Sequence, residues 1–318
     1  MPAIAIGLNQ DAFKPEQLEE LKTLSAAYDV LFGREEKEIN QHREAIEIAF
    51  HLPQAQVASL PNLRWFQQWG AGADWLQRYP ELKNSKLIIT KASGVHPVQI
   101  TEHVFALLLA FARQLPKSFA TQQKSHWRKF SHDEVFELAD KTMLILGVGA
   151  IGERIARVAQ AFGMKLFGIK RQAKPVAGIE RMLAPADLHR VLPEADVVVI
   201  TLPLTPETRN FISRKELELM KADACLINIG RGGLIDEDAL LNVLKQGKLR
   251  GVGLDVFEQE PLASTSPLWQ QERVIITSHY AGLSPNYHKR VIRLFLENLK
   301  RYRAKEALLN VVDKTLGY

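Results

Sequence analysis

Residues 143–152 read MLILGVGAIG, an apolar run that passes directly into a glycine-rich turn. Gly147, Gly149 and Gly152 have the spacing GxGxxG, and residues 153–162 have the apolar periodicity of a helix. In a strand–turn–helix unit, the first glycine permits a tight turn, the second lets backbone approach a pyrophosphate, and the third lets helix and strand pack closely. A tight turn without a ligand shows the same spacing. The strand before it and the helix after it favour a dinucleotide site, with the helix N-terminus facing the phosphates.

Five further apolar runs follow along the chain. They read LFGI (166–169), VVVIT (197–201), CLINI (225–229), VGLDV (252–256) and VIIT (274–277). Such near-continuous apolarity is typical of parallel strands covered by helices on both faces. One intervening helix, expected over Asp236–Gln246, begins with acidic residues and ends at Gly247. This region is therefore predicted to be a doubly wound, Rossmann parallel sheet.

The first hundred residues carry a weaker pattern of the same kind. Strands are expected at Ala3–Ile6, Val30–Phe32, Ile46–Phe50, Trp65–Gln68 and Leu87–Thr90, with a helix at Pro15–Ala27. Two helices, Ile100–Gln114 and Pro285–Arg303, border the central region. We predict an α/β protein in which a dinucleotide-binding domain (99–284) is inserted into a smaller, flavodoxin-like α/β substrate domain (1–98 and 285–318).

The end of the second strand of the central region distinguishes the two nicotinamide cofactors. An acidic residue about 20 positions after the glycines would bind the ribose 2′-hydroxyl of NAD. Lys170 occupies that place and Arg171 follows it. These cations suit a phosphate, although a solvated basic turn has the same composition. The sequence favours NADP(H) over NAD(H).

Three polar residues follow the last three of these strands. They are Arg231 in NIGRGG, Glu260 in DVFEQEP and His279 in SHYAG. Each alone is also compatible with an ordinary surface residue. Because the carboxyl ends of parallel strands meet at one edge of a sheet, we expect an arginine, a carboxylate and a histidine to face the same crevice.

The segments NIGRGGLIDEDAL, GLDVFEQEPL, SPLW and TSHYAGLS, with GVGAIG before them, resemble the D-isomer-specific 2-hydroxyacid dehydrogenase family. The resemblance runs from about Trp65 to Asn310 and implies hydride transfer from NAD(P)H to a small 2-oxo acid, such as glyoxylate or hydroxypyruvate. It implies that Arg231 pairs with the substrate carboxylate and that His279 donates a proton to the carbonyl oxygen. Glu260 would then hydrogen-bond the His279 imidazole and favour its charged form.

The resemblance also implies contacts for residues outside this catalytic trio. These would be Ala150 and Ile151 at the pyrophosphate, Pro203 and Thr208 bordering the cofactor, Ile229 and Asp255 at the nicotinamide and its ribose, and Ala71 and Gly72 capping the substrate carboxylate through backbone amides.

Two other functions share the same motifs. A dinucleotide-sensing scaffold of the kind found in the co-repressor C-terminal binding protein has this fold, but such a role is disfavoured because the chain has no long disordered tail. Oxidation of formate or phosphite is the other. Formate enzymes of this fold typically pair the histidine with glutamine, whereas this chain has Glu260.

The composition of the chain argues against a disulfide-bonded protein and against a membrane protein. The chain has 318 residues, 46% of them hydrophobic, and its single cysteine, Cys225, excludes an internal disulfide and fits a reducing compartment. The longest apolar stretch, Val104–Ala112, is too short to cross a bilayer. The first residues have neither the basic region nor the apolar run of a signal peptide, so we expect none. We expect a cytoplasmic protein without a membrane partner. The lone thiol lies in an apolar run and is expected to be inert.

The net charge of +5 is confined to one segment. Residues 285–318 hold eight basic and three acidic residues, which account for the whole excess. Apolar positions there recur at helical spacing, so most of these cations line a solvated helix face, and we expect no nucleic-acid partner.

Four histidines and one tryptophan bear on metal binding and on self-association. His96, His103, His126 and His132 lack metal-ligand spacing, so no metal site is predicted. Trp127 lies in a loop through which, by resemblance, the chain forms a homodimer; burial within its own chain is the alternative.

Overall fold

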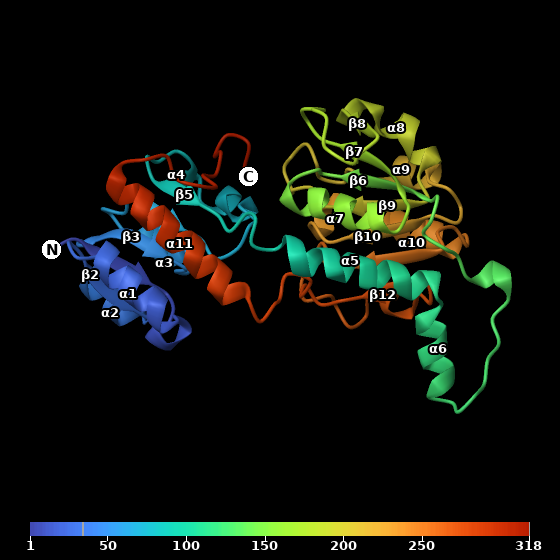
Figure 1. Cartoon of the computed structure of the whole chain (residues 1–318), viewed down its shortest axis with the longest axis horizontal. Coiled ribbons are helices and arrows are strands. Elements are labelled where there is room, and N and C mark those ends of the chain that lie inside the picture. Colours follow the sequence, from blue (N-terminus) through green and yellow to red (C-terminus); the bar gives the residue numbers. More distant parts are fainter. Residues whose placement is uncertain (34, 318) are drawn as a thin grey trace. The chain divides into compact units, whose positions relative to one another are not determined.

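The computed structural model describes residues 1–33 and 35–317, and the chain divides into two compact units (Figure 1). One unit comprises Met1–His96 and the chain from Ser284 onward; the other comprises Pro97–Leu283. Each unit contains a parallel sheet with helices on both faces. The α/β class, with a Rossmann sheet and a flavodoxin-like sheet, is confirmed.

The Pro97–Leu283 unit, as far as the structure describes it, is built on a seven-stranded sheet of order β12-β11-β10-β9-β6-β7-β8. The strands are β6 (Thr142–Leu146), β7 (Lys165–Ile169), β8 (Arg181–Leu183), β9 (Val197–Ile200), β10 (Cys225–Asn228), β11 (Gly251–Leu254) and β12 (Val274–Ile276). The order reverses between β6 and β9, which is where ligands bind in such sheets. Sequence patterning did not predict β8, because its three residues, RML, form no apolar run.

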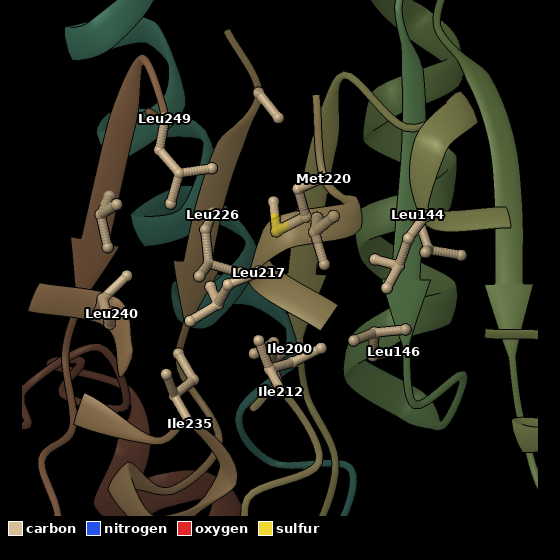
Figure 2. Packing of buried hydrophobic residues seen from close by; sticks show 14 of the residues in the cluster. Leu144, Leu146, Ile200, Ile212, Leu217, Met220, Leu226, Ile235, Leu240 and Leu249 are labelled. Atoms are coloured by element: carbon tan, nitrogen blue, oxygen red, sulfur yellow. The ribbon is translucent and has the colours of Figure 1, made fainter. Parts of the chain in front are cut away.

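Helices cover both faces of this sheet. They are α5 (Pro97–Ala112), α7 (Ala150–Ala161), α8 (Leu188–Val191), α9 (Arg214–Leu219) and α10 (Glu237–Lys245); a further helix, α6 (Leu115–Gln122), follows α5. Successive strand residues point to opposite faces. Leu144 and Leu146 therefore belong to the core under α8–α10, whereas Met143 and Ile145 pack with α5 and α7. Figure 2 shows the first of these cores, with Leu217 and Leu240 of α9 and α10 against the sheet.

Helix α5 differs at both ends from the expected span of Ile100–Gln114. It begins at Pro97, a residue that the first turn of a helix tolerates because no intrahelical N–H is needed there. It ends at Ala112, and Gln114 has φ of 54°, in the left-handed region. The chain turns there and enters α6, which was not predicted and which projects beyond the end of α5 (Figure 1).

The other unit contains a five-stranded parallel sheet of order β2-β1-β3-β4-β5, the flavodoxin-like order, within the residues described. Its strands are β1 (Ala3–Ile6), β2 (Asp29–Phe32), β3 (Ile46–Phe50), β4 (Trp65–Gln67) and β5 (Ile88–Thr90). Its helices are α1 (Pro15–Leu24), α2 (Glu36–Gln41), α3 (Gln54–Ser59), α4 (Pro80–Lys83) and α11 (Tyr287–Ala304). Helix α1 ends three residues before the expected Ala27.

Helix α11 returns the chain to this sheet and is fixed there by aromatic stacking and a buried amide. The Phe295 ring stacks on Phe50, with 4.4 Å between centroids. Asn298, fully buried, donates from Nδ2 to Gln67 Oε1 at 3.0 Å, and its Oδ1 accepts the Leu309 backbone N–H at 2.7 Å. Most cations of the helix, such as Lys300, lie on its exposed side.

Neither a bilayer-spanning helix nor a group of metal ligands is found among the residues that the structure describes. None of the helices there combines the length and the apolarity needed to span a bilayer. In the same residues, His, Cys, Asp and Glu side chains form no group of three that could hold a metal ion.

The Cys225 thiol is expected to be unreactive in the folded protein. The side chain is buried at the start of β10, and this burial raises the pKa of the thiol to about 12. At pH 8 the reactive thiolate is therefore almost absent. We expect no labelling by a thiol reagent such as 5,5′-dithiobis(2-nitrobenzoate) under native conditions and one equivalent in guanidinium chloride. Rapid stoichiometric labelling of the native protein would contradict this packing.

Candidate active site

The loop after β10 holds Arg231 between two fixed neighbours. Asn228, 1% exposed, accepts the Gly230 N–H at Oδ1 (3.0 Å) and donates from Nδ2 to the Arg231 carbonyl oxygen (2.9 Å). A Cβ on Gly232 would lie 1.8 Å from the carbonyl carbon of Phe257, so only glycine lets this loop lie against the loop after β11. The backbone of the Arg231 loop is thereby held beside the segment that carries Glu260.

Glu260 and His279 form a direct hydrogen bond. His279 Nδ1 lies 2.6 Å from Glu260 Oε2, while Glu260 Oε1 accepts the Phe257 N–H at 2.9 Å. Both carboxylate oxygens of Glu260 are therefore engaged, and the imidazole orientation is set. The His279 side chain is 48% exposed, and because Nδ1 is occupied, Nε2 is the ring nitrogen that can exchange a proton with a small molecule.

The backbone at His279 adopts an uncommon conformation. Its φ is 55°, in the left-handed region that costs a non-glycine residue about 1–3 kcal/mol unless the surroundings stabilise it. The His279 N–H donates to the Asp255 carbonyl oxygen at 2.8 Å. The Asp255 carboxylate, 2% exposed, accepts the N–H groups of Tyr280 (3.1 Å) and Ala281 (3.0 Å). Asp255 thus fixes the backbone conformation at His279 and the two residues after it.

The turn between β6 and α7 has the form of a phosphate cradle. Gly147 has φ of 100°, and a Cβ there would lie 2.9 Å from Thr201 Oγ1. A Cβ on Gly152 would lie 2.5 Å from the Gly147 carbonyl oxygen. Gly149 faces open space at the start of α7, and no side chain caps that helix. Unblocked amides at a helix N-terminus fit a dinucleotide pyrophosphate, so the residues present suit this group.

Ala150 and Ile151, the residues expected at the pyrophosphate, form the first turn of α7. Lys170 and Arg171 come directly after β7, and the Lys170 N–H donates to the Leu183 carbonyl oxygen at the end of β8 (3.1 Å). The positive charge of Arg171 acts on the carboxyl group of Glu207. A hydrogen bond from the Thr205 hydroxyl and, more weakly, the Arg171 guanidinium hold the pKa of Glu207 below its usual value.

The remaining residues that the family resemblance implied lie in three places. Pro203 and Thr208 close one turn after β9, where Thr208 Oγ1 donates to the Pro203 carbonyl oxygen at 2.7 Å. Ile229 is buried directly after β10. Ala71 and Gly72 lie in the other unit, in the loop after β4, where the Gly72 carbonyl oxygen accepts from Gln68 Nε2 at 2.6 Å. The ligand contacts of all these residues stay predictions.

Several residues that shape the site carried no recognised signal in the sequence. Asn228 is one polar residue within NIGRGG, and Thr277 is the last residue of an expected strand. The spacing of His103 in the sequence bears only on metal binding, whereas in the structure its Nε2 lies 3.0 Å from Thr277 Oγ1. The signal that could have identified it is a polar pair, Gln99 and His103, spaced four residues apart on a mostly apolar helix.

Trp127 is 87% exposed, so the alternative of a tryptophan buried within its own chain is wrong. Phe119 on α6 is also largely exposed. The two aromatic rings leave an apolar surface on the segment that projects beyond α5.

Comparison with known proteins agrees with this geometry. Residues 105–281 match the profile of the D-isomer specific 2-hydroxyacid dehydrogenase, NAD binding domain. A glyoxylate reductase of Thermococcus litoralis is 34% identical over 264 residues, which cover 81% of this chain and 79% of that protein.

Two solved structures superpose on nearly the whole chain. The NADPH-dependent glyoxylate/hydroxypyruvate reductase of Sinorhizobium meliloti, in complex with NADP and sulfate, is 28% identical, covers 100% of both chains and gives a TM-score of 0.83. A D-isomer specific 2-hydroxyacid dehydrogenase of Xanthobacter autotrophicus Py2, in complex with NADPH and MES, is also 28% identical, covers 100% of this chain and 99% of that chain, and gives the same TM-score of 0.83. With a dinucleotide cradle, a Glu–His pair and an arginine loop at the carboxyl ends of one parallel sheet, the chain belongs to the D-isomer specific 2-hydroxyacid dehydrogenase family and is an NAD(P)-dependent oxidoreductase.

Proposed function

We propose that this protein reduces a small 2-oxo acid to the D-2-hydroxy acid and uses NADPH in preference to NADH. The observation that carries the proposal is the 2.6 Å hydrogen bond between His279 and Glu260. The loop that holds Glu260 packs against the loop that holds Arg231. A carboxylate that fixes an imidazole with one ring nitrogen available is an arrangement suited to general acid catalysis.

The residues divide the chemistry between them. The reduced nicotinamide, when bound, supplies the hydride. Arg231 binds the substrate carboxylate through its planar guanidinium and polarises the carbonyl oxygen. His279 donates the proton on Nε2 to that oxygen and recovers one from it in the reverse reaction. Glu260 stabilises the imidazolium and keeps Nδ1 engaged, so the ring presents only Nε2 to the substrate.

The domain roles follow from the positions of these groups. Residues 99–284 form the dinucleotide-binding domain in this proposal, with the GxGxxG turn, Pro203, Thr208, Ile229 and Asp255 around the cofactor. Residues 1–98 and 285–318 form the substrate domain, whose Ala71 and Gly72 amides bind the substrate carboxylate.

The preference for NADPH rests on the two cations after β7. A carboxylate at the place of Lys170 would accept the 2′-hydroxyl of NAD and repel a 2′-phosphate, whereas Lys170 and Arg171 offer positive charge to it. Two similar proteins, from S. meliloti and X. autotrophicus, were solved with NADP and NADPH, which supports the use of this cofactor here.

Glyoxylate and hydroxypyruvate are the substrates that we favour, because relatives bear the names glyoxylate reductase and glyoxylate/hydroxypyruvate reductase. Formate oxidation is disfavoured by Glu260, and a sensing scaffold without turnover would show no rate with any 2-oxo acid. We also propose a cytoplasmic homodimer that buries the exposed rings of Phe119 and Trp127.

Replacing Lys170 and Arg171 together by alanine is expected to lower kcat/KM for NADPH about 10- to 100-fold and to change that for NADH less than about threefold. The reason is that a hydrogen bond to a charged group contributes about 1.5–3 kcal/mol. Initial rates with glyoxylate at saturation measure both values. Lys165→Ala, at the opposite end of β7, is the matched control and should leave both unchanged. No NADPH preference in the natural protein would overturn the cofactor assignment.

Replacing His279 by alanine is expected to lower kcat for 2-oxo acid reduction at least about 100-fold, because a positioned general acid contributes about 10²–10⁴. Binding of NADPH, followed by fluorescence, should stay within about threefold of the natural value. The exposed His42 provides the control, His42→Ala. Full activity of the His279→Ala protein would show that another group supplies the proton.

A further inference from the structure

Helix α5 supports both ends of the segment that carries His279. Gln99 and His103 lie four residues apart and so on one side of the helix. Gln99 Nε2 donates to the Gly282 carbonyl oxygen at 3.0 Å, and His103 Nε2 lies 3.0 Å from Thr277 Oγ1. The His103 ring also meets Tyr280 edge to face, with 5.3 Å between centroids. The helix therefore contacts the segment before, within and after the turn at His279.

The directions of the hydrogen bonds in this network can be assigned. Thr277 Oγ1 lies 2.6 Å from Asp255 Oδ1, and since a carboxylate only accepts, the Thr277 hydroxyl is the donor. The hydroxyl has a single proton, so the Nε2–H of His103 must donate to Thr277 Oγ1. Burial lowers the pKa of His103 despite the opposing charge of Asp255, which favours the neutral ring. The contact with Thr277 then places the one ring proton on Nε2.

The chain of contacts ends at the backbone of His279. Asp255 receives the Thr277 hydroxyl and the amides of Tyr280 and Ala281 on its carboxylate, and the His279 amide on its carbonyl oxygen. The left-handed φ of His279 must be imposed by such contacts, because the residue does not favour it by itself. Thr277 and His103 orient the carboxylate that imposes it.

We propose that His103 and Thr277 are positioning residues that hold the Asp255 carboxylate, and through it the backbone of His279, in the arrangement that allows proton transfer. Neither residue touches the reacting atoms in this scheme. The inference rests on the proposed role of His279, and it adds α5 to the elements that determine the rate of the chemical step.

The kinetic test uses paired variants. Thr277→Val keeps the shape but removes the hydroxyl, and His103→Leu removes the Nε2–H donor. Each should lower kcat about 10- to 100-fold with glyoxylate while the KM for NADPH stays within about threefold. Thr277→Ser and His103→Gln retain a hydroxyl and an amide donor, respectively, and should recover kcat to within about threefold of the natural protein.

His189→Leu is the matched control. His189 Nε2 lies 2.5 Å from the Glu216 carboxylate, away from the His279 segment, so its removal also breaks a histidine–acid contact but should change kcat less than twofold. Natural kcat values in Thr277→Val and His103→Leu would overturn the proposal. A loss of kcat that Thr277→Ser and His103→Gln fail to recover would also overturn it, since packing rather than hydrogen bonding would then be responsible.

A second measurement separates this proposal from the proposed function. Amide hydrogen exchange at Tyr280 and Ala281 should be at least about tenfold faster in Thr277→Val than in the natural protein, with the β11 amides unchanged. If the natural protein reduces no 2-oxo acid, the proposed function fails, but the exchange rates still test the link from Thr277 to this turn. Unchanged exchange at both amides would break that link.

Discussion

The buried carboxylate of Asp255 is the constraint on which the geometry of this site depends. A charge taken out of water must be compensated by hydrogen bonds, and here the donors come from the 277–281 segment. Those bonds leave the backbone at His279 one conformation, with φ of 55°. The side chain that results reaches Glu260. His279 thus lies on a strained turn that the buried Asp255 carboxylate stabilises, and in the proposed mechanism this histidine is the general acid.

The loop after β10, which carries Arg231, lies close to the loop after β11, which carries Glu260. Gly232 allows the Arg231 loop to lie against Phe257, next to the backbone amide that holds Glu260. Any side chain at Gly232 would separate the two loops. The arginine, the glutamate and the histidine therefore depend on three adjacent strands, β10, β11 and β12, and on the parallel register that brings their carboxyl ends to one edge.

Much of this arrangement could be predicted from the sequence, because it follows from patterns along the chain. Continuous apolar runs identified six of the strands in the Pro97–Leu283 unit, and their parallel order placed Arg231, Glu260 and His279 at one edge. The strand β8 and the helix α6 could not be identified in this way, since neither has a distinctive apolar pattern. The side-chain hydrogen bonds of the site could not be predicted from the sequence, for a different reason. The contact between His103 and Thr277 joins residues 174 positions apart, and no spacing rule predicts it.

The net charge of the chain and the cations of the candidate site lie in different parts of the sequence. The whole net charge lies in residues 285–318, mostly on the solvated side of α11, far along the chain from Lys170, Arg171 and Arg231. In the proposed function, Arg231 acts through its place in a glycine-rich loop, and Lys170 and Arg171 act through their place at the end of β7. Their position at the edge of the sheet, rather than the sum of charges, would then give these residues their roles.

The most direct test of the general acid is the pH dependence of the reaction in both directions. Rates of 2-oxo acid reduction and of D-2-hydroxy acid oxidation would be measured at low substrate concentration across pH 5–10. We expect kcat/KM for reduction to fall as pH rises, because His279 must carry the proton that it donates. The value for oxidation should fall as pH decreases, because the same imidazole must then accept a proton. The same trend in both directions, or no trend, would contradict a single histidine acting as acid and base.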